Sequence, residues 1–71
     1  MIRYEVWQHR TSGERFLVRY RDDRESVDLV GPFSRRDLKP DRTDLEDLWL
    51  NQTVSEAIKV RLNQSEDFKA I

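Results

Sequence analysis

The chain has 71 residues, of which 38% are charged, and its 13 Lys and Arg against 14 Asp and Glu give a net charge of −1. This length supports one small core, and the balance of charge excludes a polycationic arm or an acidic tail. The lack of cysteine excludes disulfides and thiolate metal sites, and no apolar run approaches the ~18 residues of a membrane span. We therefore expect one cytoplasmic domain over residues 1–64, followed by a polar tail over residues 65–71 that either frays or docks on a partner.

The N-terminal third predicts a β-hairpin. Residues 2–7 and 16–21 alternate apolar and polar side chains, as half-buried strands do. A two-residue turn ending at Gly13 would place two arginines opposite each other, whereas a three-residue loop ending there pairs Arg10 with Glu14. We expect the three-residue loop, with Gly13 in the left-handed conformation. The further pairs are then Trp7 with Leu17, Val6 with Val18, Glu5 with Arg19, and Tyr4 with Tyr20.

A third strand is expected over residues 26–30, after a turn centred on Asp23-Arg24. Its pairs with the second strand are Val27 with Tyr20, Leu29 with Val18, and Asp28 with Arg19. This register divides the sheet into two faces. The face expected to form the core holds Ile2, Tyr4, Val6, Phe16, Val18, Tyr20, Val27 and Leu29. The face expected to be exposed holds Arg3, Glu5, Trp7, Arg15, Leu17, Arg19, Arg21, Asp28 and Val30.

After Gly31-Pro32, which is expected to end the sheet, the sequence predicts helices. A hydroxyl residue followed three positions later by an acid is the capping-box pattern of helix starts. The pattern occurs at Ser34 with Asp37, Thr43 with Glu46, and Thr53 with Glu56. Because Pro40 follows the first of these closely, residues 34–38 are expected to form one turn at most.

Apolar spacing predicts two short helices rather than one long one. On a single helix, one apolar cluster would lie nearly opposite the other, although the sheet offers one core face. The clusters are Leu45, Leu48 and Trp49, and Val54, Ala57, Ile58 and Leu62. We expect a break at Asn51-Gln52 and helices near 44–50 and 54–64. The predicted fold class is α+β: a three-stranded antiparallel meander followed by two short C-terminal helices packed on the sheet.

The residue types do not predict an enzyme. His9 is the only histidine, and it lies at the exposed end of the first predicted strand. Gly13 and Gly31 are the only glycines, so no phosphate-binding glycine loop is present. The paired carboxylates lie in turns or at helix starts, where acids favour the helix dipole or the solvent. We therefore expect no catalytic residue, no metal site, no cofactor and no small-molecule substrate.

The exposed face predicts a binding surface. In the expected register Trp7, Leu17 and Val30 lie side by side on it, next to Arg19. An exposed tryptophan among arginines is typical of interaction hot spots. Alternatively, the helix near 44–50 folds over this face and buries it. We expect a non-enzymatic protein-interaction module that binds a protein partner, or forms a homodimer, through these four residues.

The charge is distributed unevenly between the halves of the chain. Residues 1–36 carry eight Arg against six acids, and residues 37–71 carry five Lys and Arg against eight acids. This difference is either ordinary scatter or the mark of a basic sheet that meets an acidic partner, including the helices of another copy.

Nucleic acid is the alternative partner. The surface would then consist of Arg3, Trp7, Arg15, Arg19 and Arg21. Residues 15–22 and 31–34 resemble strand and strand-to-helix segments of the three-stranded DNA-binding domains of plant factors and phage-integrase arms. The resemblance implies a sheet that lies in a groove of the nucleic acid. Against it, acidic residues interrupt the arginine stripe, and the pI of about 5.8 is low for such a domain.

Overall fold

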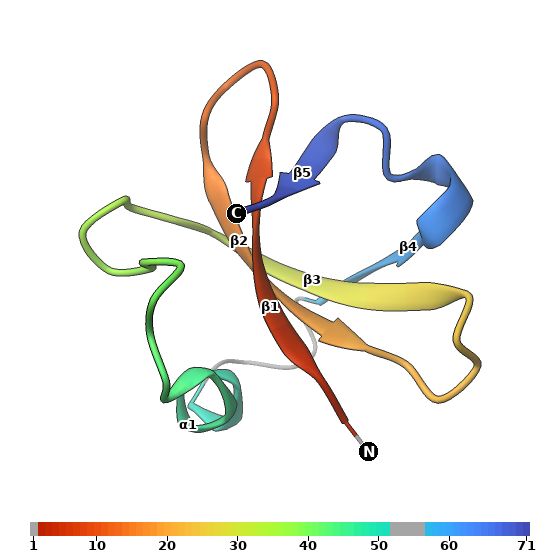
Figure 1. The fold of residues 1–71 in the computed structure, drawn as a ribbon, viewed down its shortest axis with the longest axis horizontal. Helices are drawn as coiled ribbons and strands as arrows, with labels where there is room; N and C mark the ends of the chain where they lie inside the picture. The colour runs from red at the N-terminus through yellow and green to blue at the C-terminus, as the bar shows by residue number, and fades with distance from the viewer. Residues whose placement is uncertain (1, 52–56) are drawn as a thin grey trace.

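A computed structural model describes residues 2–51 and 57–71 and contains one curled antiparallel sheet in the order β4-β3-β2-β1-β5. The strands are β1 (Tyr4–His9), β2 (Arg15–Tyr20), β3 (Ser26–Phe33), β4 (Ile58–Arg61) and β5 (Phe68–Ala70). One short helix in the described residues, α1 (Leu45–Leu50), follows β3, and the 3-10 turn η2 (Leu62–Gln64) follows β4 (Figure 1). The predicted fold class is therefore wrong: residues 2–51 and 57–71 form a five-stranded half-barrel with one short helix, not three strands and two helices.

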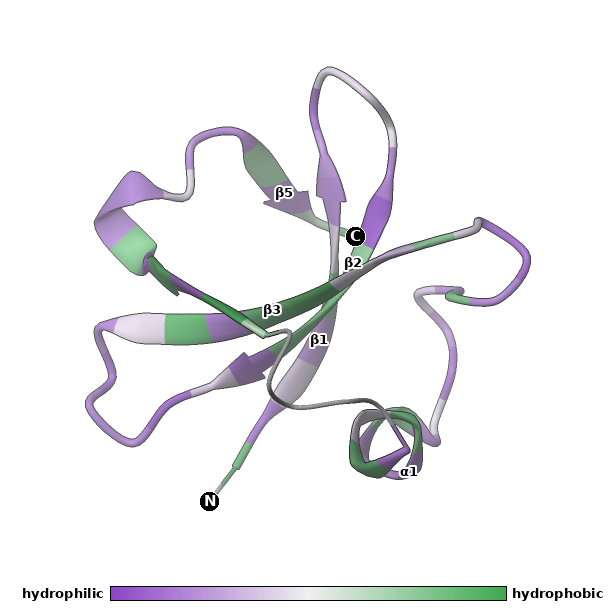
Figure 2. Ribbon diagram, turned by 180° about the vertical axis from the view of Figure 1, so that it is seen from behind, coloured by the Kyte–Doolittle hydropathy of each residue, from purple (hydrophilic) through white to green (hydrophobic). Residues whose placement is uncertain are grey.

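Apolar side chains form two clusters, one on each face of the sheet. The helix-side cluster is Val6, Leu17, Val30, Leu38 and Trp49. The inner cluster is Trp7, Val18, Val27 and Leu29, with Phe16, Tyr20, Val60, Leu62 and Phe68 packed against it. Because β4 and β5 lie at opposite edges of the sheet and both reach the inner cluster, the sheet curls around it. In Figure 2, hydrophobic colour lies on β4, on α1 and on part of β3, and hydrophilic colour lies on most of the loops.

The register of β1 differs from the prediction by one residue. Tyr4 lies opposite Arg19, Val6 opposite Leu17, and Trp7 opposite Phe16. The loop has four residues, because the His9 N–H donates to the Glu14 carbonyl at 2.8 Å. Gly13 has a φ of +76°, so its left-handed conformation is confirmed. A slip of one residue moves every side chain of a strand to the other face. Trp7 therefore joins the inner cluster, while Tyr4 and Val6 lie on the helix side.

The C-terminal strand pairs with the free edge of β1 in this register. β5 pairs with β1, with Phe68 opposite His9 and Ala70 opposite Trp7. Arg10 does not pair with Glu14: its backbone N–H donates to the Asp67 carbonyl at 2.7 Å, and its Nε donates to the Glu66 carbonyl at 2.9 Å. The tail predicted over residues 65–71 thus contains a strand in place of a frayed end.

The register between β2 and β3 is confirmed. Tyr20 pairs with Val27, Val18 with Leu29, and Arg19 with Asp28. The sheet does not end at Gly31-Pro32, however, because β3 continues to Phe33. The pairing shifts by one residue between Leu17 and Arg15, which is a β-bulge. Proline is tolerated in a bulge because the ladder does not need its missing N–H there.

One of the two predicted helices forms. α1 confirms the helix near 44–50, but its N-cap is Asp44 without a side-chain hydrogen bond, so the capping box at Thr43 is wrong. The turn at 34–38 is confirmed: the Ser34 hydroxyl donates to Asp37 Oδ2 at 2.8 Å.

The second helix, predicted over 54–64, is wrong, because residues 58–61 form β4 and residues 62–64 form η2. Ile58 and Val60 alternate with Lys59 and Arg61, so the segment also fits a strand. Pairing with β3 satisfies the backbone of that strand, which an added helix would not do. The predicted break at Gln52, the predicted cap pair Thr53 and Glu56, and the predicted helix start at Val54 lie outside the described residues.

Candidate functional site

The apolar surface predicted for partner binding is buried. Trp7 is 5% exposed, Leu17 0% and Val30 6%. Trp7 lies on the face opposite Leu17 and Val30, as a consequence of the β1 register. Leu38 and Trp49 pack against Leu17 and Val30, so the alternative in which the helix near 44–50 covers this face holds for those two residues.

Two of the predicted arginines support the helix-side cluster. Arg19 Nη2 lies 3.4 Å from Asp28 Oδ2, and its Cζ lies 4.9 Å from the centroid of the Trp49 ring. Arg15 Nη1 donates to the Leu38 carbonyl at 2.9 Å, and its Nε is buried without a hydrogen-bond partner among the described residues. These guanidinium groups therefore hold α1 and the loop before it against the sheet.

The other two arginines, Arg3 and Arg21, lie in a groove at the end of the sheet where the β2–β3 turn approaches the N-terminal segment and η2. The groove has a volume of about 480 Å³. Its lining residues are Ile2, Arg3, Tyr20, Arg21, Arg24 and Leu62, and we call it the arginine groove. It combines three guanidinium groups with three large apolar or aromatic side chains.

Tyr20 and Arg3 form a stacked pair on one side of the groove. Arg3 Cζ lies 3.9 Å from the centroid of the Tyr20 ring, a cation–π distance, and Arg3 Nε lies 3.5 Å from Glu5 Oε1. The Tyr20 hydroxyl donates to Glu5 Oε2 at 3.0 Å. Partial burial raises the pKa of Tyr20, Arg3 opposes this rise, and the hydrogen bond to Glu5 adds to it, so that the pKa lies above its ordinary value. Glu5 thus holds both residues in place.

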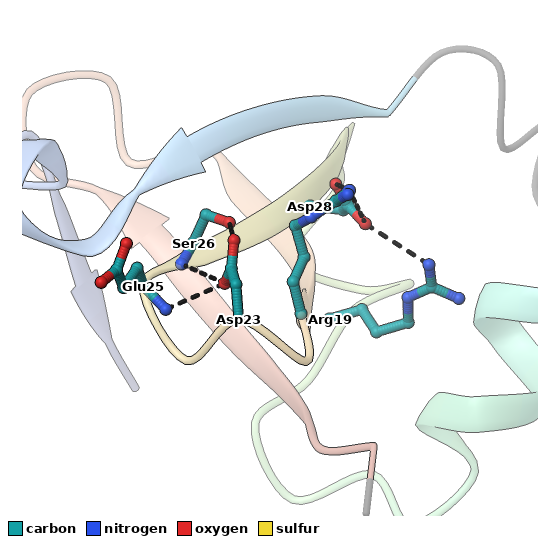
Figure 3. A network of polar contacts seen from close by, with 6 residues as sticks. Arg19, Asp23, Glu25, Ser26 and Asp28 are labelled. Carbon is teal, nitrogen blue, oxygen red and sulfur yellow. Dashed lines mark hydrogen bonds and ion pairs between the residues drawn. The ribbon is translucent and has the colours of Figure 1, made fainter.

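Arg21 is anchored by a carboxylate that it shares. Its Nη1 donates to Asp28 Oδ1 at 3.0 Å. Arg19 approaches the other oxygen of the same carboxylate (Figure 3). The Asp28 side chain is only 10% exposed, so solvent screens these contacts weakly. Two cations therefore share one anion, and Asp22 and Asp23 lie at the same end of the sheet, next to Ile2, Tyr20 and Arg21.

The β2–β3 turn presents Arg24 in an unusual backbone conformation. Asp23 Oδ1 accepts the N–H groups of Glu25 at 2.9 Å and Ser26 at 3.0 Å, and its Oδ2 accepts the Ser26 hydroxyl at 2.7 Å (Figure 3). Arg24 has a φ of +61°, a region that costs a residue with a side chain ~1–2 kcal/mol. Arg24 is exposed and forms no ion pair among the described residues.

Of the six lining residues, the sequence singles out two, Arg3 and Arg21, and only for the alternative nucleic-acid surface. The groove is assembled from the segment before β1, the β2–β3 turn and the start of η2, which are far apart along the chain. Arg24 carried one local signal, a lone cation within the acidic turn over residues 22–25. Leu62 carried no such signal, because the apolar spacing of its segment also fits a helix.

Outside the groove, His9 is engaged in local packing. Its Nδ1 accepts the Ser12 N–H at 3.2 Å, and its ring centroid lies 5.2 Å from that of Phe68. Residues 2–51 and 57–71 contain no group of three or more His, Cys, Asp or Glu placed to hold a metal ion. Over the same residues, no helix is long and apolar enough to cross a membrane.

Comparison with protein-family models finds no matching family. Neither the curated proteins nor the solved structures include one that matches this chain. We therefore identify the arginine groove as the candidate site from its lining residues and their contacts alone.

Proposed function

We propose that this protein is a non-enzymatic protein-interaction module of the cytoplasm that binds an acidic, partly apolar segment of a protein partner in the arginine groove. The position of Arg24 carries the proposal. Glycine or asparagine would fit the backbone at +61° with less strain, yet an arginine stands there beside the groove. Backbone strain of this kind clusters at functional sites, so the conformation of Arg24 supports a role in binding.

The chemistry of the groove supports this class of partner. Guanidinium groups bind carboxylates through paired N–H donors, and arginine and tyrosine are enriched in interaction hot spots. Ile2 is 53% exposed at the groove, and apolar side chains of a partner would cover it. Glu5, Asp28 and Asp23 fix the groove before a partner arrives, which reduces the entropy lost on binding.

The contacts favour a protein over nucleic acid. A nucleic-acid surface needs cations that are free to neutralise phosphates. Trp7 is buried, Arg15 is bound to the Leu38 carbonyl, and Arg19 shares Asp28 with Arg21. Of the five residues predicted for this surface, Arg3 and Arg21 alone border the groove.

A direct test uses a short labelled peptide in which glutamates are interspersed with leucines, titrated with the protein and followed by fluorescence anisotropy. We expect a dissociation constant on the order of 100 µM, weakened by salt. Arg24→Asn, which suits the left-handed backbone, should weaken binding about fivefold, the equivalent of ~1 kcal/mol for an exposed ion pair. Arg36→Asn, an exposed arginine outside the groove, is the matched control and should leave binding unchanged.

A peptide with glutamine in place of glutamate tests the charge, and a peptide with serine in place of leucine tests the apolar floor. Each should bind more weakly than the parent. Equal binding of all three peptides, or equal effects of Arg24→Asn and Arg36→Asn, would contradict the proposal. Single- and double-stranded DNA are titrated in parallel. Tighter binding of DNA than of the peptide, with affinity falling as salt rises, would replace the proposed function by nucleic-acid binding.

A further inference from the structure

The exposed side of α1 carries acidic and apolar groups together. Trp49 is 1% exposed and anchors the helix on the sheet, whereas Leu50 is 69% exposed. Glu46 and Asp47 are exposed as well. Positions 46 and 50 lie one above the other on a helix, with 47 beside them, so these three side chains form one stripe. We call Glu46, Asp47 and Leu50 the acidic stripe.

The acidic stripe has the chemistry that the arginine groove binds. Two carboxylates and a leucine match the guanidinium groups and the apolar side chains of Ile2 and Leu62. The charge of the whole chain agrees, since residues 1–36 carry eight Arg against six acids and residues 37–71 carry five Lys and Arg against eight acids. Complementary potentials of this kind steer association and fix its orientation.

The two surfaces cannot meet within one molecule. Trp49 and Leu45 pack on the helix-side cluster, so α1 turns its acidic stripe away from its own sheet. Figures 1 and 2 place α1 and the β2–β3 turn at opposite sides of the molecule. A groove and a stripe that match but face apart are free to meet between copies.

We propose that the arginine groove of one copy receives the acidic stripe of a second copy, so that the protein associates head to tail. This inference rests on the proposed function and names the partner as the chain itself. Leu50 would lie against Ile2 and Leu62, with the carboxylates toward Arg3 and Arg24. Each copy keeps one free groove and one free stripe, so the association extends beyond a dimer into rings or chains. The contact is small, so assembly is concentration-dependent, with a dissociation constant on the order of 100 µM.

Sedimentation velocity of mixed variants tests this geometry. The groove variant Arg3→Gln/Arg24→Asn and the stripe variant Glu46→Gln/Leu50→Ser change exposed positions, and circular dichroism checks their folding. The wild type should gain mass with concentration beyond the dimer, and salt should reverse this. Each variant alone should stay monomeric. An equimolar mixture should form dimers and nothing larger, because only one intact groove and one intact stripe can combine. Arg36→Asn, the control, should assemble as the wild type does.

The outcomes separate this inference from the proposed function. A wild type that stays monomeric at millimolar concentration, while the glutamate–leucine peptide still binds the groove, overturns the second copy as partner and leaves the proposed function standing. Loss of both assembly and peptide binding overturns both. Dimers that persist in the groove variant and the stripe variant alike overturn the inference in favour of a symmetric contact elsewhere.

Discussion

At the scale of single residues, Asp23 organises the β2–β3 turn and so positions Arg24. It accepts three hydrogen bonds within its own turn, from two backbone N–H groups and the Ser26 hydroxyl. The Ser26 hydroxyl is the largest cause that lowers the pKa of Asp23 to about 2, and the backbone donors add to it. The ionised carboxylate is therefore part of the folded turn, and the arginine beside it depends on that charge.

This pKa predicts a pH-dependent effect of Asp23→Asn. Because the folded pKa lies below the ordinary value of 3.8, the carboxylate stabilises the fold above that value, and the contribution is lost as pH falls toward about 2. We expect the variant to be less stable than the wild type at neutral pH, and the difference to shrink as pH falls from about 4 to about 2. Urea unfolding at a series of pH values measures this difference in the free energy of unfolding. The control is the exposed neighbour Asp22→Asn; an equal pH dependence there would mean a general charge effect.

At the scale of elements, β5 adds long-range contacts that favour the observed register of β1. The ring centroid of Phe68 lies 5.4 Å from that of Phe16 and 6.2 Å from that of Trp7. With Arg10 bound to the carbonyls of Glu66 and Asp67, the C-terminal segment holds both the ladder and the loop end of β1. A register predicted from the sequences of β1 and β2 alone takes no account of the Phe68 contacts or of the Arg10 hydrogen bonds.

Phe68→Ala should therefore destabilise the whole domain. Loss of a half-buried aromatic ring from the inner cluster is expected to lower the free energy of unfolding by about 2–3 kcal/mol. Ile71→Ala, at a position that is 38% exposed just beyond β5, should cost less than about 1 kcal/mol. Urea denaturation followed by circular dichroism compares the two variants. Equal losses of stability in the two variants would show that the Phe68 side chain of β5 does not contribute to the hydrophobic core.

At the scale of the whole molecule, the two clusters share one sheet. Neighbouring residues of β1, Val6 and Trp7, point into different clusters, and so do Leu17 and Val18 of β2. The radius of gyration of 11.2 Å equals the ~11 Å expected of a compact chain of this length. Because the clusters are two faces of the same strands, neither can lose its packing while the other keeps its own.

The two tryptophans test this coupling, since Trp7 belongs to the inner cluster and Trp49 to the helix-side cluster. The single-tryptophan variants Trp7→Phe and Trp49→Phe each report one cluster by fluorescence. In each variant we expect the fluorescence transition in urea to coincide with the loss of circular dichroism. A Trp49 signal that changes at lower urea than the circular dichroism would mean that α1 detaches while the sheet remains folded.

Local sequence patterns were enough to predict the features whose partners lie nearby along the chain. The β2–β3 register, the left-handed Gly13, the turn at 34–38 and α1 follow from side-chain alternation, turn chemistry and helical spacing. The tertiary structure decided what depended on distant segments. Ile58 and Val60 are compatible with helix or strand until the open edge of β3 selects the strand. β5 pairs with β1 in the register that buries Trp7, and Leu62 reaches the arginine groove only because β4 pairs with β3. Long-range backbone pairing, which local periodicity does not encode, decided both the faces of the sheet and the candidate site.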